Sequence, residues 1–277
     1  MKVVILAGGL GTRLMEETVI RPKPMVEVGG MPILWHIMQL YARQGFGDFV
    51  VASGYKSEYI KRYFLDYHLL NSDLRIDMGC NSVEVRRHNE TDWRVRIVDT
   101  GDKTLTGGRL LRLAPVLEDG GTFMVTYGDG LADVDLRALL RFHKRHGRIA
   151  TLTAVQPPAT KYLGVEEGRV ASLADGEGAG WVNGGFFIFK PGLFDYIDGD
   201  YETLEEGALT RLAAAGELMA YRHAGFWQCM DTPKERELLE RLWQAGSAPW
   251  ACRPDINAGL PRSRERSRSL AALRSGA

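Results

Sequence analysis

The N-terminal stretch constrains the fold of this chain more than any other. Residues 3–7 are an unbroken apolar run rich in β-branched side chains, which is typical of a buried parallel strand. The glycine-rich turn GGLGTR at 8–13 follows directly, and Lys23 then stands between Pro22 and Pro24. Glycines let backbone N–H groups approach an anion, and the two prolines stiffen the backbone around the lysine. Together these features predict a nucleotide-binding site.

The glycine-rich turn differs from two common phosphate-binding motifs. The sequence contains no Gly-x-x-x-x-Gly-Lys-Ser/Thr, which excludes a P-loop. The dinucleotide pattern Gly-x-Gly-x-x-Gly also fails, because Leu14 stands where its last glycine is required. Considered alone, the turn fits an ordinary strand-to-helix turn as well as it fits an anion site.

Apolar periodicity along the first half predicts alternating strands and helices. Pro32 is expected at the start of a helix that ends near Gly45, and residues 49–52 form a second buried strand. Ser57 is expected to cap the next helix, whose aromatic stripe over 59–67 belongs to the core. This alternation predicts an α/β fold with a mostly parallel sheet and helices on both faces.

The stretch from Ser82 to Asp99 changes to a period of two. Apolar side chains alternate with polar ones on both sides of a polar turn at 88–92, which predicts an inserted antiparallel β-hairpin. Such a hairpin is either a contact between the subunits of a homo-oligomer or a solvated edge. The sequence leaves both open.

The chain divides into four parts. Residues 1–148 are expected to form a nucleotide-binding core, and residues 149–231, in which strands prevail, a smaller sugar-phosphate-binding part or lid. Residues 232–250 form a C-terminal helix that opens on a capping box. Residues 251–277 are rich in arginine and serine and hold too few apolar side chains to pack, so we expect disorder there.

Composition excludes several classes of partner. The 35 basic and 35 acidic side chains cancel, so the charge balance indicates neither nucleic acid nor a membrane surface. No stretch approaches the roughly 18 apolar residues of a membrane-spanning helix, and the opening run is too short for a signal peptide. Cys80, Cys229 and Cys252 lack the spacing of metal ligands, so we expect a reduced, cytoplasmic protein. His143 and His146 are assigned to a solvated helix end rather than to a site.

Two aspartates are candidate metal ligands because each follows an apolar strand. Asp129 comes after the run at 122–127, and Asp231 after the run at 226–230. In open α/β sheets the ligand crevice lies beyond the carboxyl ends of the strands, where both carboxylates are expected. The alternative is that Asp129 makes an Asp–Gly turn and Asp231 merely caps the following helix.

Several longer motifs resemble one family of enzymes. GGLGTRL and RPKPMVEVGG, together with TGDKTLTGGRL, TYGDGLADVDL, VNGGFF and GFWQCMDT, resemble the sugar-1-phosphate nucleotidyltransferases, and within them the glucose-1-phosphate cytidylyltransferases. The resemblance runs from Met1 to about Trp250. It implies a Rossmann-like core that uses Mg²⁺ to join CTP and a hexose 1-phosphate, with glucose 1-phosphate expected first, into a CDP-sugar and pyrophosphate.

The resemblance also assigns roles to residues at matching positions. Lys23 and Arg13 are the implied catalytic cations, because the transferring phosphoryl group carries charge that must be neutralised. Arg109 is the implied reader of cytosine, whose adjacent acceptors match the paired donors of a guanidinium. The implied nucleotide-binding residues are Leu6, Ala7, Gly8, Gly9, Gly11, Thr12, Arg13, Lys23, Thr106, Gly108, Arg109 and Asp129. The expected substrate-binding residues include Tyr127, Asn183 and Gly184, and the implied magnesium ligands are Asp129 and Asp231.

One departure from the family pattern affects the substrate. Relatives carry a Glu-Lys-Pro segment whose lysine holds the sugar phosphate, whereas this chain reads ADGEG at 174–178 and has no lysine between Lys161 and Lys190. A doubly charged phosphate is not stable in a dry site without a cation. We therefore predict that Lys161, in the preceding loop, replaces the missing lysine.

Two other functions stay open. The first is the same chemistry on an unusual sugar or sugar-like phosphate, because the Glu-Lys-Pro segment is missing. The second is a regulatory subunit that binds a nucleotide-sugar without turnover. The presence of Lys23, Asp129 and Asp231 argues against the second, because a non-catalyst has no need for all three.

Overall fold

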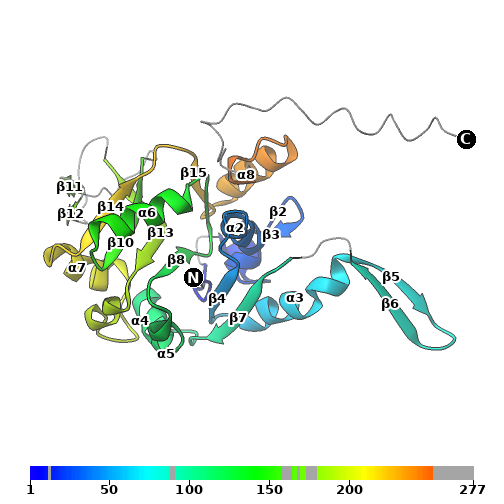
Figure 1. The fold of residues 1–277 in the computed structure, drawn as a ribbon. Coiled ribbons are helices and arrows are strands. Elements are labelled where there is room, and N and C mark those ends of the chain that lie inside the picture. The colour runs from blue at the N-terminus through cyan, green and yellow to red at the C-terminus, as the bar shows by residue number, and fades with distance from the viewer. Residues whose placement is uncertain (12–13, 88–90, 157–163, 167–168, 173–179, 252–277) are drawn as a thin grey trace, which may run out of the picture.

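A nine-stranded sheet forms the centre of the computed structural model, which describes residues 1–11, 14–87, 91–156, 164–166, 169–172 and 180–251 (Figure 1). Its strands lie in the order β11-β12-β14-β10-β13-β8-β1-β4-β7. They are β1 (Lys2–Leu6), β4 (Asp48–Ser53), β7 (Arg94–Asp99), β8 (Phe123–Tyr127), β10 (Ala150–Val155), β11 (Gly164–Glu166), β12 (Arg169–Ser172), β13 (Val182–Phe189) and β14 (Leu218–Arg222). Strands β12 and β13 run against the direction that the others share. This mostly parallel sheet confirms the predicted α/β fold.

Helices cover both faces of the sheet, as the alternation of side chains along β1 requires (Figure 1). Val3 and Ile5 belong to one buried cluster, whereas Val4 and Leu6 belong to the other. The first cluster includes residues of α2 (Ile33–Ala42), α3 (Ser57–Leu70), α6 (Leu136–His146) and α8 (Pro233–Gln244). The second includes residues of α4 (Thr106–Arg112), α5 (Ala114–Leu117) and α7 (Thr210–Ala214). A strand buried on both faces needs an unbroken apolar sequence.

The predicted cap is right for α8 and wrong for α3. Thr232 accepts a hydrogen bond from the Glu235 backbone N–H, and the Glu235 side chain accepts one from the Thr232 backbone, which completes the capping box. At α3, Ser57 is the first helical residue rather than the N-cap. Lys56 occupies the N-cap position in the left-handed conformation, with φ 52°.

The hairpin predicted over Ser82–Asp99 is wrong, because its two strands pair with other strands. β6 (Ser82–Arg87) pairs antiparallel with β5 (Ser72–Asp77), which the sequence pattern did not indicate. β7 instead pairs in parallel with β4 at the edge of the main sheet. Its residues alternate because one face packs on the core and the other faces solvent, a pattern that hairpin strands share. The β5–β6 hairpin projects from the body of the molecule (Figure 1), and residues 88–90 of the predicted turn lie outside the described residues.

The strands of the second half extend the same sheet. β13 pairs with β8 of the first half, and β10 lies between β13 and β14. A short ladder of β9 (Gly130–Ala132) and β15 (Trp227–Cys229) returns the chain to the end of β8. A further small pair, β2 (Glu27–Val28) with β3 (Met31–Pro32), precedes α2. The division into a nucleotide part and a sugar-phosphate part stays a prediction.

Two assignments of side chains need correction. The stripe on α3 belongs to the core only in part, since Ile60 is fully buried but Tyr59 is 43% exposed. His143 does not lie at a solvated helix end, because its ring is buried against β10 with Nδ1 2.8 Å from Thr151 Oγ1. Burial lowers the pKa of His143 to about 4, and the pKa of the half-buried His146 falls to about 4 for the same reason.

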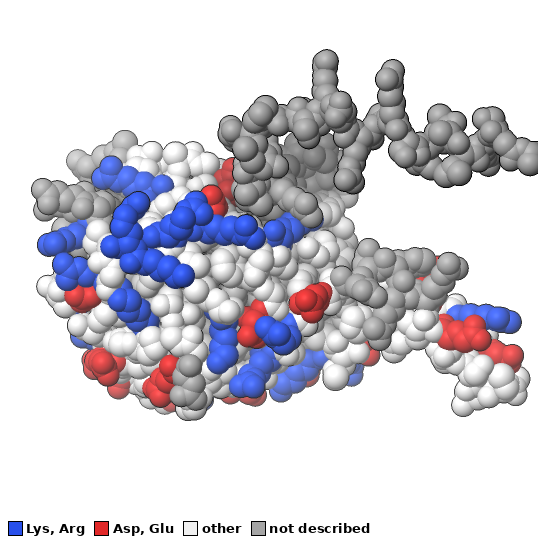
Figure 2. All heavy atoms as spheres, in the orientation of Figure 1, with Lys and Arg blue, Asp and Glu red and all other residues white. Residues whose placement is uncertain are grey.

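The surface carries its charges unevenly although the net charge is zero. Basic side chains gather over the region that α6 forms (Figure 2), and Arg137, Arg141, Lys144 and Arg145 of that helix are exposed. Within the described parts of the chain, no helix has the length and apolar character needed to cross a membrane. Residues 252–277 lie outside the described residues, and the cytoplasmic location stays a prediction.

Candidate active site

A cavity of about 500 Å³ opens where β1 and β8 end and β13 begins, the place expected for a ligand in an open α/β sheet. The predicted residues that line it are Leu6, Ala7, Gly8, Gly9, Gly11, Lys23, Thr106, Arg109, Tyr127, Asp129, Asn183, Gly184 and Asp231. Gly108 does not line the cavity. It lets α4 pack closely against the backbone at Asp200, since a Cβ on Gly108 would lie 2.4 Å from Asp200 Cα. Thr12, Arg13 and Lys161 lie outside the described residues.

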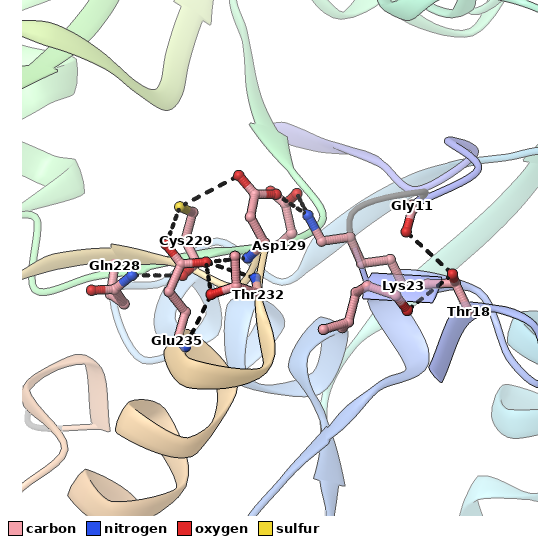
Figure 3. Close-up of polar contacts among 10 residues, drawn as sticks. Gly11, Thr18, Lys23, Asp129, Gln228, Cys229, Thr232 and Glu235 are labelled. Atoms are coloured by element: carbon pink, nitrogen blue, oxygen red, sulfur yellow. Dashed lines mark hydrogen bonds and ion pairs between the residues drawn. The ribbon is translucent and has the colours of Figure 1, made fainter. Parts of the chain in front are cut away.

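Lys23 lies between the two candidate metal ligands. It begins a short 3₁₀ helix (Lys23–Met25), and its side chain is only 10% exposed. Its Nζ is 2.6 Å from Asp129 Oδ2 and also pairs with Asp231 Oδ1; the first contact is visible in Figure 3. Burial alone would lower the pKa of Lys23, but the two carboxylates outweigh it and raise that pKa, so the ammonium stays charged.

Backbone pairing holds the two carboxylates side by side. Asp129 follows β8 and Asp231 follows β15, and the antiparallel ladder places Cys229 opposite Gly130. The Met230 N–H also donates to the Asp129 carbonyl at 2.9 Å. The N-cap of α8 is Thr232, so the alternative in which Asp231 merely caps that helix is wrong. The two aspartates meet as strand ends, as the sequence predicted.

Arg109 is buried beneath the glycine-rich turn. Its Nη1 donates to Thr100 Oγ1 and to the Gly101 carbonyl, both at 2.7 Å, and its Nη2 donates to the Gly8 carbonyl at 2.8 Å. Burial lowers the pKa of Arg109. A Cβ on Gly8 would lie 2.2 Å from Arg109 Nη1, so glycine is needed there for packing as well as for close approach to a ligand. Cytosine recognition by Arg109 stays a prediction, and it requires the guanidinium to exchange one of these acceptors for the base.

A second polar group lies on the β13 side of the cavity. The Tyr127 hydroxyl donates to Glu205, and Asn183 Nδ2 lies 3.5 Å from the Tyr127 oxygen. Thr106 Oγ1 lies 3.4 Å from Glu205 Oε2 and accepts from the Leu204 N–H at 2.8 Å. Burial raises the pKa of Glu205, which begins a π-helical turn (Glu205–Leu209), a local structure often found at functional sites. No sequence motif indicated a role for Glu205.

Comparison with known proteins identifies the family. Residues 2–230 match the nucleotidyl transferase family. The chain belongs to this family. It is 51% identical over 254 residues to the glucose-1-phosphate cytidylyltransferase of Salmonella typhi, a match that covers 90% of this chain and 98% of that protein. It is 41% identical over 253 residues to the probable glucose-1-phosphate cytidylyltransferase of Bacillus subtilis, covering 90% of this chain and 99% of that protein. These matches confirm the resemblance that the motifs indicated.

Solved structures of lower identity share the fold of this nucleotidyl transferase. HddC from Yersinia pseudotuberculosis superposes with a TM-score of 0.70 at 22% identity, over 87% of this chain and 99% of that one. A UDP-glucose pyrophosphorylase complexed with UDP-glucose gives a TM-score of 0.68 at 14% identity, over 88% and 98% of the two chains. At these identities the superpositions support the Rossmann-like core alone.

The carboxylate pair of this nucleotidyl transferase fits a divalent cation. Members of the family generally use a divalent metal ion. Among the described residues no group of three or more His, Cys, Asp or Glu side chains is placed to hold a metal. Mg²⁺ needs no such cage, because it commonly takes one or two carboxylates and completes its shell with phosphate oxygens and water. Asp129 and Asp231 offer two carboxylates side by side, and their role as magnesium ligands stays a prediction.

Two further lining residues had no predicted role. Trp227 Nε1 donates to the Gly184 carbonyl at 2.7 Å, which fixes the start of β13 against β15. Burial raises the pKa of Cys229 to about 12, so its thiol stays protonated at neutral pH and is a poor nucleophile. Both residues belong to the motif GFWQCMDT, where their apolar run indicated only a strand.

Proposed function

We propose that this nucleotidyl transferase makes a CDP-sugar and pyrophosphate from CTP and a hexose 1-phosphate, with glucose 1-phosphate as the first candidate and Mg²⁺ as the metal ion. One observation carries the proposal. A charged lysine lies between two carboxylates at the edge of a cavity lined by the glycine-rich turn, in a chain that is 51% identical to a glucose-1-phosphate cytidylyltransferase.

The residues around Lys23 suit an in-line transfer of the nucleotidyl group. An oxygen of the sugar phosphate attacks the α-phosphorus of CTP, a new P–O bond forms, and pyrophosphate leaves with the electron pair of the bond that breaks. Lys23 neutralises charge on the transferring group, and the glycine-rich turn offers backbone N–H groups to the triphosphate. Asp129 and Asp231 would hold the metal ion, which when bound neutralises charge on phosphate oxygens.

Recognition of the two substrates is assigned to opposite sides of the cavity. On the α4 side, Arg109 has the paired donors that cytosine requires, once they leave the backbone carbonyls. On the β13 side, Tyr127 and Asn183 offer a hydroxyl and an amide to the hydroxyls of a sugar. Glu205 fixes the Tyr127 hydroxyl and therefore contributes to the shape of that side.

Pyrophosphate release over a panel of triphosphates and sugar 1-phosphates tests the proposal. We expect turnover with CTP and glucose 1-phosphate, dependent on Mg²⁺ and far above that with UTP, dTTP or GTP. Turnover with CTP but only with another sugar-like phosphate would favour the altered-substrate alternative. Binding of CDP-glucose without turnover of any pair would identify a non-catalytic subunit.

We also propose that the chain forms a homo-oligomer through the β5–β6 hairpin. Leu74 pairs with Val85 and Ile76 with Val83, so these four side chains, between 41% and 56% exposed, share one face of the hairpin. A two-stranded hairpin is barely stable in water unless such a face is covered. Sedimentation of the parent and of the I76D/V83D variant tests this, with a smaller species expected for the variant and identical profiles counting against it.

A further inference from the structure

Glu235 contacts the backbone of the candidate metal ligand Asp231. The carboxylate oxygen Oε2 of Glu235 accepts hydrogen bonds from the Asp231 N–H at 2.7 Å and from the Thr232 N–H at 2.8 Å. The Thr232 hydroxyl lies 3.1 Å from the same oxygen (Figure 3). Glu235 is half-buried at the third position of α8.

These contacts exceed what a helix cap requires. A capping box needs the glutamate to accept only from the N-cap N–H, here that of Thr232. The bond to the Asp231 N–H is additional and reaches the residue before the helix. Cys229 Sγ lies 3.6 Å from Glu235 Oε1 and 3.7 Å from Asp231 Oδ2, so the thiol also links the two carboxylates. The arrangement therefore acts on Asp231 as well as on the helix.

The segment that carries Asp231 lies between a short strand and the start of α8. β15, which precedes it, is three residues long and pairs with the three-residue β9. Past β15, Met230 donates to the Asp129 carbonyl on one side of the segment. Glu235 holds the segment on the other side by accepting from two successive backbone N–H groups, those of Asp231 and Thr232.

Helix α8 is also anchored to the chain that follows Lys23. Glu240 Oε2 accepts from the Gly29 N–H at 2.7 Å. Arg236 Nε lies 3.4 Å from the Glu27 carbonyl oxygen. The same helix thus contacts the segment that follows Lys23 through its middle and the Asp231 backbone through its first turn.

We propose that Glu235 is a positioning residue that sets the Asp231 carboxylate relative to Lys23 and Asp129. This inference rests on the proposed function in one respect, the assignment of Asp231 as a metal ligand. Outer contacts of this kind typically change metal affinity or activity by about 10- to 100-fold when they are lost. In this proposal, the position of the Glu235 acceptor oxygen matters for Asp231, and the negative charge of Glu235 does not.

Two variants distinguish the position of the Glu235 acceptor oxygen from the charge of its carboxylate. Glu235→Gln keeps an acceptor oxygen at the same reach but removes the charge, and glutamine also serves in capping boxes. Glu235→Asp keeps the charge but withdraws the carboxylate by one methylene. The Kd of Mn²⁺ is measured in the presence of CTP from the electron paramagnetic resonance signal of free Mn²⁺. We expect Glu235→Asp to raise this Kd by about 10- to 100-fold and Glu235→Gln to leave it within about threefold.

Thr232→Ala is the matched control for the helix. It removes the side-chain cap but leaves the hydrogen bond between Glu235 and the Asp231 N–H. We expect it to lower the melting temperature by about 2–4 °C and to leave the Mn²⁺ Kd unchanged. The inference is overturned if Glu235→Gln weakens Mn²⁺ binding more than Glu235→Asp does, or if Glu235→Asp matches Thr232→Ala.

The readout does not depend on the sugar. Should the parent bind Mn²⁺ with CTP but make no CDP-glucose, the proposed function fails while the comparison of the two Glu235 variants still decides the positioning role. Should the parent make CDP-glucose and Glu235→Asp keep the parental Mn²⁺ Kd, the positioning role fails alone.

Discussion

The two ends of the cavity are built in different ways. At the lysine end, Lys23, Asp129 and Asp231 come from segments far apart in sequence, and ion pairs join all three. A backbone hydrogen bond from Met230 and the carboxylate of Glu235 fix the segments that carry the two aspartates. Both aspartates at this end therefore pair with the same ammonium.

The β13 side of the cavity, called the sugar end below after its proposed role, contains no such ion pair within the described residues. Its wall presents the Tyr127 hydroxyl, the Asn183 amide and the nearby Glu205 carboxylate. Among the described lining residues, the basic side chains are Lys23 and Arg109, and both already have acceptors. A sugar phosphate bound there still needs a cation. The difference agrees with the proposed roles, in which the lysine end carries out the transfer and the sugar end selects the substrate.

Removal of either aspartate should have the largest effect. Asp129→Asn and Asp231→Asn each take away one negative charge that faces Lys23, and each would lose a magnesium ligand. We expect kcat to fall by a factor on the order of 10²–10³ in each variant, because a preorganised electrostatic contact is lost. Pyrophosphate release at saturating substrate measures the change.

The double variant tests whether the two aspartates work as a unit. Residues that share one function are strongly non-additive, so the double variant should be little worse than either single one. If the losses in the two single variants multiply in the double variant, the aspartates act independently. If the single variants keep substantial magnesium-dependent turnover, the two aspartates are not the proposed metal ligands.

Lys161→Ala should give the next largest effect, confined to the sugar end. One charge-assisted contact is worth roughly 1.5–3 kcal/mol, or about 10- to 150-fold in affinity. We expect the KM for glucose 1-phosphate to rise by that factor and the KM for CTP to stay nearly constant. Steady-state kinetics with each substrate varied in turn measure both.

Arg222→Ala is the comparison variant for this prediction. Ala154 pairs with Asn183 on one side and with Arg222 on the other, so the three side chains share one face of the sheet. A KM that rises for Arg222→Ala but not for Lys161→Ala would place the cation on β14. Failure of glucose 1-phosphate with Lys161 intact would favour an altered substrate.

Arg109→Ala should raise the KM for CTP less than the loss of an arginine without other hydrogen-bond partners would. Its donors already bind backbone carbonyls, so recognition of cytosine exchanges one set of hydrogen bonds for another. We therefore expect the KM for CTP to rise about tenfold, at the lower end of the range for a charged donor, and the preference for CTP over UTP to narrow. Thermal unfolding should also begin at a lower temperature, because three buried acceptors lose their partner. An unchanged preference for CTP would move base recognition to another residue.

Features that depend on one segment at a time were predictable from the sequence. The apolar run of β1, the aspartate after β8 and the capping box of α8 follow from local composition and from strand direction. The partner of a strand was not, because the edge strand β7 and the hairpin strand β6 show the same alternation. The sequence therefore located a hairpin but chose the wrong second strand.

Contacts between distant segments account for the remaining differences. Glu205 lies in a stretch whose periodicity indicates an ordinary helix, and only the fold brings it to the Tyr127 hydroxyl. The buried place of His143 depends in the same way on Thr151 of the next strand. Gly8 was assigned to anion binding, but its direct contact with Arg109 also leaves no room for a Cβ. Roles of this kind depend on contacts between residues distant in sequence, so they can be assigned only from the three-dimensional structure.

Truncation of the C-terminal tail should have the smallest effect on either end of the cavity. The structure places the cut after Ala251, because Trp250 is 2% exposed and the Ala251 carbonyl accepts from Arg43. Residues 252–277 lie outside the described residues, and their low apolar content predicts that they do not pack. We expect the truncated chain to match the parent in melting temperature and in KM for both substrates.

A cut after Pro249 is the control, and loss of the buried Trp250 should cost about 3–5 kcal/mol, or roughly 10 °C in melting temperature. A higher KM for glucose 1-phosphate alone in the Ala251 truncation would show that tail arginines serve the sugar end, and Lys161 would then not be needed as its cation.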